Sequence, residues 1–498
     1  MRSLLVAIIA FLCPLTGFSQ IWRLGVDASG QLSAGTGPYL PFWQRTCEGG
    51  FMPYSSSGVL TAGVDISCTG ASGWMFEAGT NLVGSLAAGN PVHDARFYGL
   101  VDRLYVSGSW KMLHLDIGKK PRVRELGDLS VTGGNLVISG YARNLPGINA
   151  WSDWIHFDKN HIFGIKGNLA HYQMNDLRYI QDAMIHNKSL AVKFGYRDII
   201  TLAAGLDHWA QWGGVSPVLG PRPDSIRDLF RVMLGGNGGS DATLSDQLNA
   251  LGNHLGREYV RLSWNSLDFS LKLQYDMIYD DGKNIIQTQT FPDGVWSATF
   301  SLRRNALVTD LTYEYIHTTW QSGSRHDRPA TEEEMTKDYG KYVYWQDPEH
   351  LFYGKIVEGG LDNYFNNSEY RSGWTYHGTT IGLPLLLPFA PGEDGITLGI
   401  VNNRVRGHHF GVKGVVGKVP YKFKATYTSN WGRYSNRSGS VFETRPKQLS
   451  LALEVALRRQ VTRLPVDFAV GLYGDCGKLY QNSIGLSLRV LFDRWFIL

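Results

Sequence analysis

The chain has 498 residues, a formal net charge of +4 and an aromatic content of 12%, with 15 Trp and 25 Tyr. The charges are nearly balanced and no basic stripe follows the chain, which excludes a typical nucleic-acid-binding protein. Beyond the first residues we find no run of eighteen or more apolar residues, so the sequence predicts no transmembrane helix.

Residues 1–20 have the features of a signal peptide. Arg2 supplies the positive start, residues 4–15 form an apolar run interrupted only by Pro14, and small residues precede a cut near Gln20. We therefore expect an exported protein whose mature part, residues 21–498, is a single domain.

Apolar and polar residues alternate strictly along much of the mature chain. Leu113, Leu115 and Ile117 alternate with His114 and Asp116, and the same pattern recurs at 189–197, 269–279, 421–428, 448–458, 466–473 and 483–492. Successive side chains of a strand point to opposite faces, so these segments are strands with one apolar face. A soluble β-sandwich has the same alternation, and length and export must decide between the two.

Export, length and aromatic content favour a transmembrane barrel over a sandwich. Strands can cross lipid only in a closed barrel, and Trp and Tyr suit the girdles at its two interfaces. At roughly 25 residues for each strand with its connections, the mature chain predicts on the order of 16 to 20 strands. The expected fold is all-β, an antiparallel barrel in the outer membrane, surrounded by its lipid.

Residues 224–256 break the strand pattern. Asp224 can cap a helix, Ile226, Leu229 and Met233 lie at helical spacing, and a glycine cluster from Gly235 ends the run. A second helix is expected to follow and to close at Gly252. Because a barrel wall has no place for helices, we expect a helical plug in or below the lumen, or capping one mouth.

Residues 318–380 also lack the alternation. They are charged and aromatic, and they predict long outer loops with a short helix at 332–338. Removal of the signal peptide leaves Cys47, Cys68 and Cys476, so at most one internal disulfide is expected, most simply between Cys47 and Cys68.

Several motifs resemble the Wzi-type capsule assembly proteins, in a divergent branch of that family. They are LPFW at 40–43, GDLSVTGGN at 127–135, SGYARNLPG at 139–147, NALGNHLG at 249–256, DNYFNN at 362–367 and YRSGWTYHGTTIG at 370–382. The resemblance implies an outer-membrane barrel of about 18 strands with a helical plug on the periplasmic side. It further implies a lectin that holds exported capsular polysaccharide at the cell surface, in contact with the export machinery.

No catalytic, metal or cofactor motif stands out. Gly-x-Ser-x-Gly, His-Glu-x-x-His and Walker patterns are absent from the sequence, so we expect neither an enzyme nor a cofactor. His408 and His409 are adjacent on a predicted strand and face opposite ways, which disfavours joint metal binding. Arg404 and Arg406 are expected to share a face, most simply the lumen wall.

The best candidate for ligand binding is the aromatic and polar stretch 362–382. Aromatic rings flanked by amide and guanidinium donors suit sugars, which combine apolar C–H faces with hydroxyls. The predicted polysaccharide-binding residues are Tyr370, Arg371, Trp374, Tyr376, His377 and Arg143. The alternative is a folded constriction loop whose polar groups are satisfied internally, and for Arg143 a role in a turn.

Three classes of function remain open. The first is a surface polysaccharide-binding assembly protein, which the resemblance favours. The second is an outer-membrane channel or transporter for small solutes or oligosaccharides, which luminal helices and long loops disfavour. The third is a membrane enzyme, for which the sequence offers no catalytic set.

Overall fold

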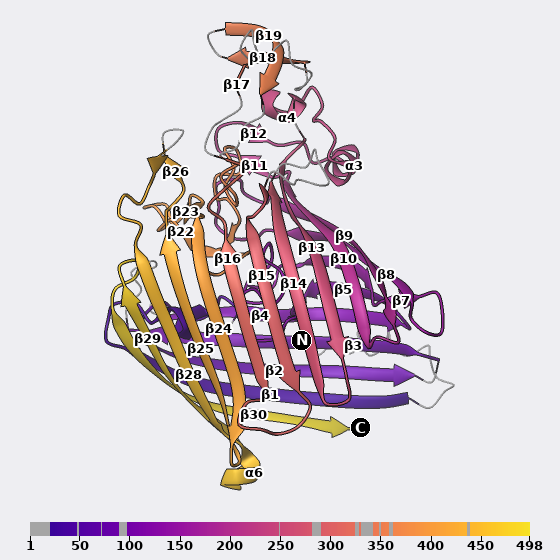
Figure 1. The fold of residues 1–498 in the computed structure, drawn as a ribbon, viewed down its shortest axis with the longest axis vertical. Coiled ribbons are helices and arrows are strands. Elements are labelled where there is room, and N and C mark those ends of the chain that lie inside the picture. Colours follow the sequence, from indigo (N-terminus) through magenta and orange to yellow (C-terminus); the bar gives the residue numbers. More distant parts are fainter. Residues whose placement is uncertain are drawn as a thin grey trace.

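The structure, a computed structural model, describes residues 20–46, 49–70, 72–88, 97–248, 250–280, 290–323, 328–329, 342–347, 350–357, 362–435 and 439–498. Its main element is a closed antiparallel barrel of 18 strands (Figure 1). The ring closes where the first strand, β1 (Gln20–Gly35), pairs with the last, β30 (Ser483–Ile497). The predicted fold class is therefore confirmed.

The other wall strands follow one another around the ring in chain order, and β6 and β7 share one place because both pair with β8. They are β2 (Ser57–Gly70), β3 (Trp74–Ala87), β4 (Phe97–Trp110), β5 (Leu113–Lys119), β6 (Gly147–Ser152), β7 (Ile155–His156), β8 (Phe163–Gln173), β9 (Met184–Tyr196), β10 (Ile200–Trp212), β13 (Asn253–Asn265), β14 (Phe269–Asp280), β15 (Gly294–Leu302), β16 (Asp310–His317), β24 (Val405–Val416), β25 (Val419–Asn430), β28 (Lys447–Leu457) and β29 (Asp467–Gly477).

The alternation read from the sequence separates the outward and inward faces of the wall. On β28, Leu451 and Leu453 are 36% and 39% exposed, whereas Ser450 and Ala452 between them are 3% exposed. Outward apolar side chains on a closed barrel match a hydrocarbon surrounding, and inward polar ones match a hydrated or hydrogen-bonded interior. The lipid-facing side of these strands is therefore the one that the sequence predicts.

The two ends of the barrel differ in their connections. At one end the strands are joined by tight turns, such as the one from Tyr196 to Ile200, and both chain ends of the barrel lie there. At the other end lie the long connections, among them those from β1 to β2, β10 to β13 and β16 to β24. We call these ends the short-turn mouth and the long-loop mouth. In outer-membrane barrels short turns face the periplasm, so the long-loop mouth corresponds to the outside.

The helices predicted within 224–256 form, and of the expected positions they take the one at a barrel mouth, not one in or below the lumen. Helix α3 (Ile226–Leu234) begins at a capping box of Ser225 and Asp228 and ends at Gly235 in left-handed backbone. Helix α4 (Leu244–Leu248) is short, and residues from Asn253 already belong to β13. Both helices lie beyond the strand ends at the long-loop mouth, not below the lumen on the periplasmic side (Figure 1). They belong to the β10–β13 connection, and this connection starts and ends at that mouth.

The remaining short elements belong to the long connections. They are α2 (Phe42–Thr46), β11 (Val215–Ser216), β12 (Gly220–Pro221), β17 (Arg328–Pro329), β18 (Tyr342–Asp347), β19 (His350–Val357), β20 (Thr375–Tyr376), β21 (Thr379–Thr380), β22 (Leu387–Pro388), β23 (Ile400–Asn402), β26 (Tyr434–Ser435) and β27 (Gly439–Ser440). The exception is α6 (Arg459–Thr462), which lies in the β28–β29 turn.

Some expectations fall outside the described residues. These are the signal peptide before Gln20, the helix predicted at 332–338, and the disulfide, because Cys47 is one of its partners. Among the helices that the structure describes, none is both long and apolar enough to span a membrane.

Candidate functional site

Three segments from the long-loop mouth fold inward and obstruct the barrel. They are residues 36–56 (47 and 48 apart), 120–146 and 362–404, and we call them the plug. Their apolar and aromatic side chains join inward-facing wall residues in one buried cluster, to which the plug contributes Phe42, Trp43, Val131, Leu136, Val137, Ile138, Tyr141, Leu145, Tyr364, Phe365, Trp374, Tyr376 and Ile381 among others. The lumen is thus obstructed mainly by irregular chain with a packed core, not by helices.

Backbone hydrogen bonds tie the plug segments to one another. The Ser139 N–H donates to the Ile381 carbonyl at 2.9 Å, and the Leu383 N–H donates to the Leu136 carbonyl at 2.9 Å. The indole N–H of Trp374 donates to the Val137 carbonyl at 2.6 Å. Irregular chain can be buried only if its peptide groups find such partners, so the plug is a folded unit.

Polar side chains of the wall hold the plug in place. The indole N–H of Trp43 donates to Thr426 Oγ1 on β25 at 2.9 Å, and Nε2 of His409 on β24 meets the Leu129 carbonyl at 2.7 Å. Glu314 on β16 accepts a hydrogen bond from Ser130 Oγ at 2.7 Å. These inward groups are buried and bonded, which explains the polar face of the wall strands.

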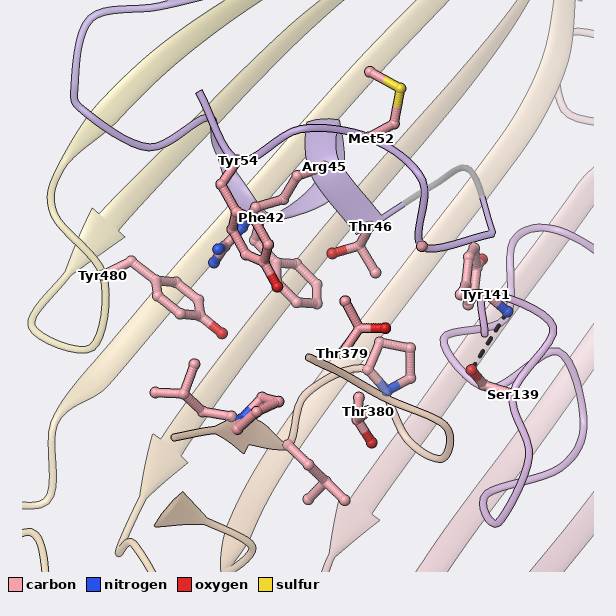
Figure 2. Close-up of a pocket in the computed structure, with 15 residues that line it drawn as sticks. Phe42, Arg45, Thr46, Met52, Tyr54, Ser139, Tyr141, Thr379, Thr380 and Tyr480 are labelled. Atoms are coloured by element: carbon pink, nitrogen blue, oxygen red, sulfur yellow. Dashed lines mark hydrogen bonds between the residues drawn. The ribbon is translucent and has the colours of Figure 1, made fainter. Parts of the chain in front are cut away.

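A pocket of about 90 Å³ lies where the plug meets the long-loop mouth (Figure 2). We call it the mouth pocket. All of its lining residues come from long-loop segments; they include Arg45 and Thr46 of α2, Tyr54, Tyr141, Thr379, Thr380 and Tyr480. The pocket is too small to enclose a sugar chain, so a polymer would lie across it.

Arg45 stands between two tyrosine rings of the mouth pocket. Its guanidinium carbon lies 5.1 Å from the centre of the Tyr54 ring and 4.9 Å from that of Tyr480. Tyr480 in turn stacks on Phe42, with ring centres 6.0 Å apart and planes 10° from parallel. Burial raises the pKa of Tyr480 to about 12, so its hydroxyl keeps its proton and can donate a hydrogen bond.

Two of the residues predicted from the sequence lie beside this pocket. Arg143 donates from Nε to the Gly50 carbonyl at 3.0 Å, and Gly50 also borders Thr379. The backbone N–H of His377 donates to Asp176 Oδ2 at 2.9 Å. Burial, and next the positive charge of Arg143, lower the pKa of His377 to about 4, so the imidazole is neutral at physiological pH.

The other four predicted residues lie elsewhere. Tyr370, Trp374 and Tyr376 are buried in and around the plug, with Trp374 0% exposed, and the Tyr370 hydroxyl donates to the Gly213 carbonyl at 3.3 Å. Arg371 is exposed, and its guanidinium carbon lies 4.9 Å from the centre of the Tyr179 ring. Most polar groups of the stretch 362–382 are bonded within the protein, as in a constriction loop, but the Tyr364 hydroxyl and Thr380 Oγ1 are buried without a partner among the described residues. A direct role of these four residues in binding stays a prediction.

A second hollow, of about 570 Å³, lies between the plug and the wall. We call it the lumen cavity. Its wall residues include several near the short-turn ends of their strands, such as Glu77, Trp151 and Lys166. The lumen cavity thus lies on the other side of the plug from the mouth pocket.

Several charged side chains of the lumen cavity form ion pairs, whereas Arg122 lies beside the rings of Tyr172 and Trp209. Glu125 of the plug meets Lys166 at 2.6 Å and Arg261 at 2.5 Å, and Lys120 meets Asp116 at 2.8 Å. Burial alone would raise the pKa of Glu125, but Arg261 and Lys166 together hold it well below its usual range. These pairs fasten segment 120–146 to the wall.

Two predictions about strand faces have different outcomes. His408 and His409 do face opposite ways: His409 is buried inside, and His408 points outward beside Tyr313. Arg404 and Arg406 both contact Thr319, but Arg406 lies on the outward face, so the lumen-wall expectation is wrong. Arg404 is buried and lies just before β24, whereas Arg406 is exposed, so strand alternation does not extend to Arg404.

Sequence reasoning missed the central residues of the mouth pocket. Phe42 belongs to the LPFW motif, which could have drawn attention to Arg45 two residues after Trp43. Tyr54 and Tyr480 carry no such signal, because a distance of more than 400 residues separates them in the chain and only barrel closure brings them together.

Comparison with known proteins places the fold. No family model and no curated protein matches the chain. Among solved structures, Wzi of Escherichia coli, an outer-membrane carbohydrate-binding β-barrel involved in group 1 capsule assembly, superposes with a TM-score of 0.50 at 13% identity over 99% of this chain and 88% of Wzi. The chain is an outer-membrane β-barrel.

Other solved outer-membrane barrels are also similar in fold. OpdK of Pseudomonas aeruginosa, solved with vanillate, has a TM-score of 0.46 at 11% identity and covers 95% of this chain and 99% of its own. OccAB4 of Acinetobacter baumannii has a TM-score of 0.44 at 8% identity and covers 97% of this chain and 100% of its own. At these identities the likeness concerns the barrel and not the ligand.

Proposed function

We propose that this barrel binds exported capsular or other surface polysaccharide at its long-loop mouth and assists attachment of the polymer at the cell surface. The observation that carries the proposal is the packed plug, because a lumen obstructed by a buried aromatic core leaves the outer surface as the place where a large ligand can act. The partners would be the polysaccharide, the surrounding lipid and the export machinery, and no catalytic step is involved.

The mouth pocket supplies chemistry that suits a sugar. Tyr54 and Tyr480 offer ring faces to apolar C–H surfaces, and Thr46, Thr379 and Thr380 offer hydroxyls. Arg45 and Arg143 form no salt bridge within the described part of the chain, so they can pair with carboxylates of an acidic polymer. Of the residues predicted from the sequence, we assign Arg143 and His377 to this site.

The buried predicted residues support the site indirectly. Trp374 and Tyr376 are part of the cluster that also contains Phe42 and Tyr141, which line the mouth pocket. We propose that they fix the position of the plug, whereas Arg371 lies outside the pocket.

The test is polymer binding by Arg45→Gln. Loss of one charge-assisted contact is worth roughly 1.5–3 kcal/mol, so affinity for a uronic-acid polymer should fall about tenfold or more. In cells, the ratio of attached to released polysaccharide should fall at matched barrel levels. The control is Arg371→Gln, which removes an exposed plug arginine away from the pocket and should leave both measurements unchanged. Equal effects of the two variants would contradict the proposed site.

The lumen cavity favours a second candidate, an outer-membrane channel or transporter for small solutes or oligosaccharides. A hollow of about 570 Å³ lined by charged, amide and aromatic side chains could hold a small solute if the plug moved. Conductance of the purified barrel in a planar bilayer separates the candidates: steady ionic current through the unmodified protein would favour the channel.

A further inference from the structure

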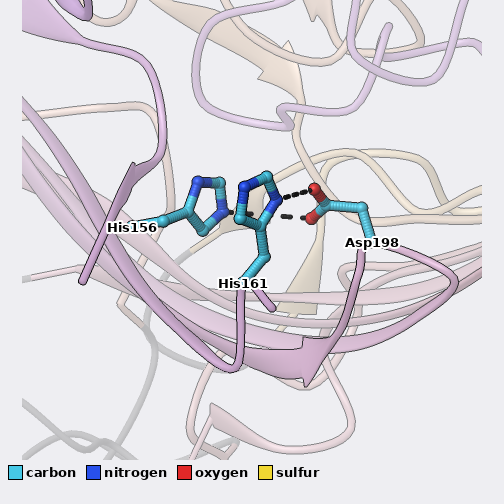
Figure 3. A group of neighbouring side chains, drawn as sticks. All are labelled: His156, His161 and Asp198. Carbon is cyan, nitrogen blue, oxygen red and sulfur yellow. Dashed lines mark hydrogen bonds and ion pairs between the residues drawn. The ribbon is translucent and has the colours of Figure 1, made fainter. Parts of the chain in front are cut away.

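A cluster of two histidines and one aspartate lies at the short-turn mouth (Figure 3). None of the three residues lines the mouth pocket or the lumen cavity. His156 ends β7, His161 lies in the turn between β7 and β8, and Asp198 lies in the turn between β9 and β10. Three side chains from two neighbouring turns thus converge on one point.

The ring nitrogens of both histidines point to the same carboxylate. His161 Nδ1 lies 2.6 Å from Asp198 Oδ2, and His156 Nε2 lies 3.9 Å from Oδ1. The imidazoles are stacked, with centres 3.8 Å apart and planes 5° from parallel. All three donor atoms lie within 4.8 Å of one another. Bonds of about 2.0–2.2 Å to a shared ion need donors at most about 4.2 Å apart. Each imidazole donates in its own ring plane, so one of the two stacked rings must turn out of the stack for both to bind the same ion.

One further feature is unexplained by packing alone. Nε2 of His156 is buried without a hydrogen-bond partner among the described residues. The left-handed backbone of Asp198 belongs to the tight turn in which the Ile199 N–H donates to the Tyr196 carbonyl at 2.9 Å, so that turn accounts for it.

One cation already competes for the carboxylate. Lys193 Nζ lies 2.6 Å from Asp198 Oδ1 and 4.9 Å from the centre of the Trp154 ring. The indole gives the ammonium a second favourable position, so Lys193 can leave the carboxylate without losing every partner.

We propose that His156, His161 and Asp198 bind a divalent transition-metal ion of the Zn²⁺ class. Two imidazoles and a carboxylate select such an ion over Mg²⁺ or Ca²⁺, which prefer all-oxygen sites. Three protein ligands leave a position for water. The ion would join the β7–β8 and β9–β10 turns and displace Lys193 from Asp198.

The experiment uses the full barrel in detergent, without a polyhistidine tag, titrated with Zn²⁺ and with Co²⁺ as a spectroscopic substitute. We expect one equivalent to bind and visible Co²⁺ bands to appear, with affinity reduced more than tenfold in His156→Ala and in His161→Ala. Lys193→Gln should raise the affinity, because it removes the competing cation.

The matched control is His114→Ala. His114 lies at the same mouth, pairs with Asp153 at 2.9 Å and stacks on Trp151 with ring centres 3.8 Å apart, but among the described residues it belongs to no group of three such ligands. Its removal should leave binding unchanged. Equal losses in all three histidine variants, absence of Co²⁺ bands, or unchanged affinity in Lys193→Gln would overturn the proposal and leave an ion-pair cluster.

Discussion

The mouth pocket and the lumen cavity lie on opposite sides of one plug, and ion pairs hold several charged side chains of the lumen cavity but not Arg45 of the mouth pocket. In the lumen cavity, Glu125 is shared by Lys166 and Arg261. In the mouth pocket, Arg45 is held between the rings of Tyr54 and Tyr480, without a salt bridge in the described part of the chain. Paired charges fasten a segment, whereas a stacked guanidinium still has donors for a ligand. The difference separates the ion-paired charges that fasten the plug from Arg45, and Arg122 of the lumen cavity, beside the Tyr172 and Trp209 rings, resembles Arg45 in this respect.

The largest effect should come from the core that separates the two sides. Trp374→Ala removes a fully buried indole and its hydrogen bond to Val137, and such a truncation costs about 3–5 kcal/mol. We expect the barrel to assemble but the plug to loosen, with increased conductance and weaker polymer binding. Trp374→Phe keeps most of the volume and should have a smaller effect. Unchanged conductance in Trp374→Ala would mean that the other plug contacts suffice.

The next effect concerns the lumen cavity alone. Glu125→Gln leaves Lys166 and Arg261 without their shared carboxylate and should cost about 1.5–3 kcal/mol. Protease cleavage within 120–146 should become faster, while polymer affinity stays the same. Glu77→Gln is the milder control, since Glu77 meets only Lys120, at 3.3 Å. A loss of polymer affinity as large as that of Arg45→Gln would show that the two sides are not separate.

A smaller effect is expected from a substitution in the mouth pocket. Tyr480→Leu removes a ring that stacks on Phe42 and holds Arg45, and each such contact contributes about 0.5–1.5 kcal/mol. Polymer affinity should fall a few-fold, with protease resistance of the plug unchanged. Tyr480→Phe keeps the ring and should retain most of the affinity; if both variants bind equally weakly, the hydroxyl and not the ring is what matters.

The smallest effect is a pH dependence at the edge of the mouth pocket. Burial holds the pKa of His377 at about 4, below the ordinary 6.5. Between pH 6.5 and 4, His377 is protonated when its segment is open and neutral when the segment is packed. Packing around His377 therefore weakens as pH falls from 6.5 to 4. Tryptophan quenching by acrylamide should increase over this range, and His377→Asn should reduce the increase. A response confined to pH below 4 would point to carboxylates instead.

The wall of the barrel could be predicted from the sequence, because lipid imposes a simple rule. Leu451 and Leu453 face outward and Ser450 inward as the alternation requires. The outward orientation of Arg406 could not be predicted, because near the mouth a guanidinium is stable on either face of the wall. Here its guanidinium carbon lies 5.4 Å from the centre of the Trp431 ring.

The interior of the barrel was harder to predict from the sequence than the wall, for a different physical reason. Trp374 and Tyr376 have the composition of a sugar platform, but the same rings also make a dry core, and only tertiary packing decides which. The mouth pocket joins residues near both ends of the chain, so no local pattern could reveal it.

The pairing of β1 with β30 also determines the order in which this protein can assemble. Arg23 pairs with Ile497 and Gly35 with Gly485, so the ring cannot close before the last strand is in place. Every earlier stage has two unpaired edges, and each unsatisfied peptide group in hydrocarbon costs several kcal/mol. Contacts this distant in the chain also close slowly. The polypeptide must therefore be kept from aggregating until all strands are available, and a chain that lacks β30 should be degraded in the periplasm instead of inserting as a smaller barrel.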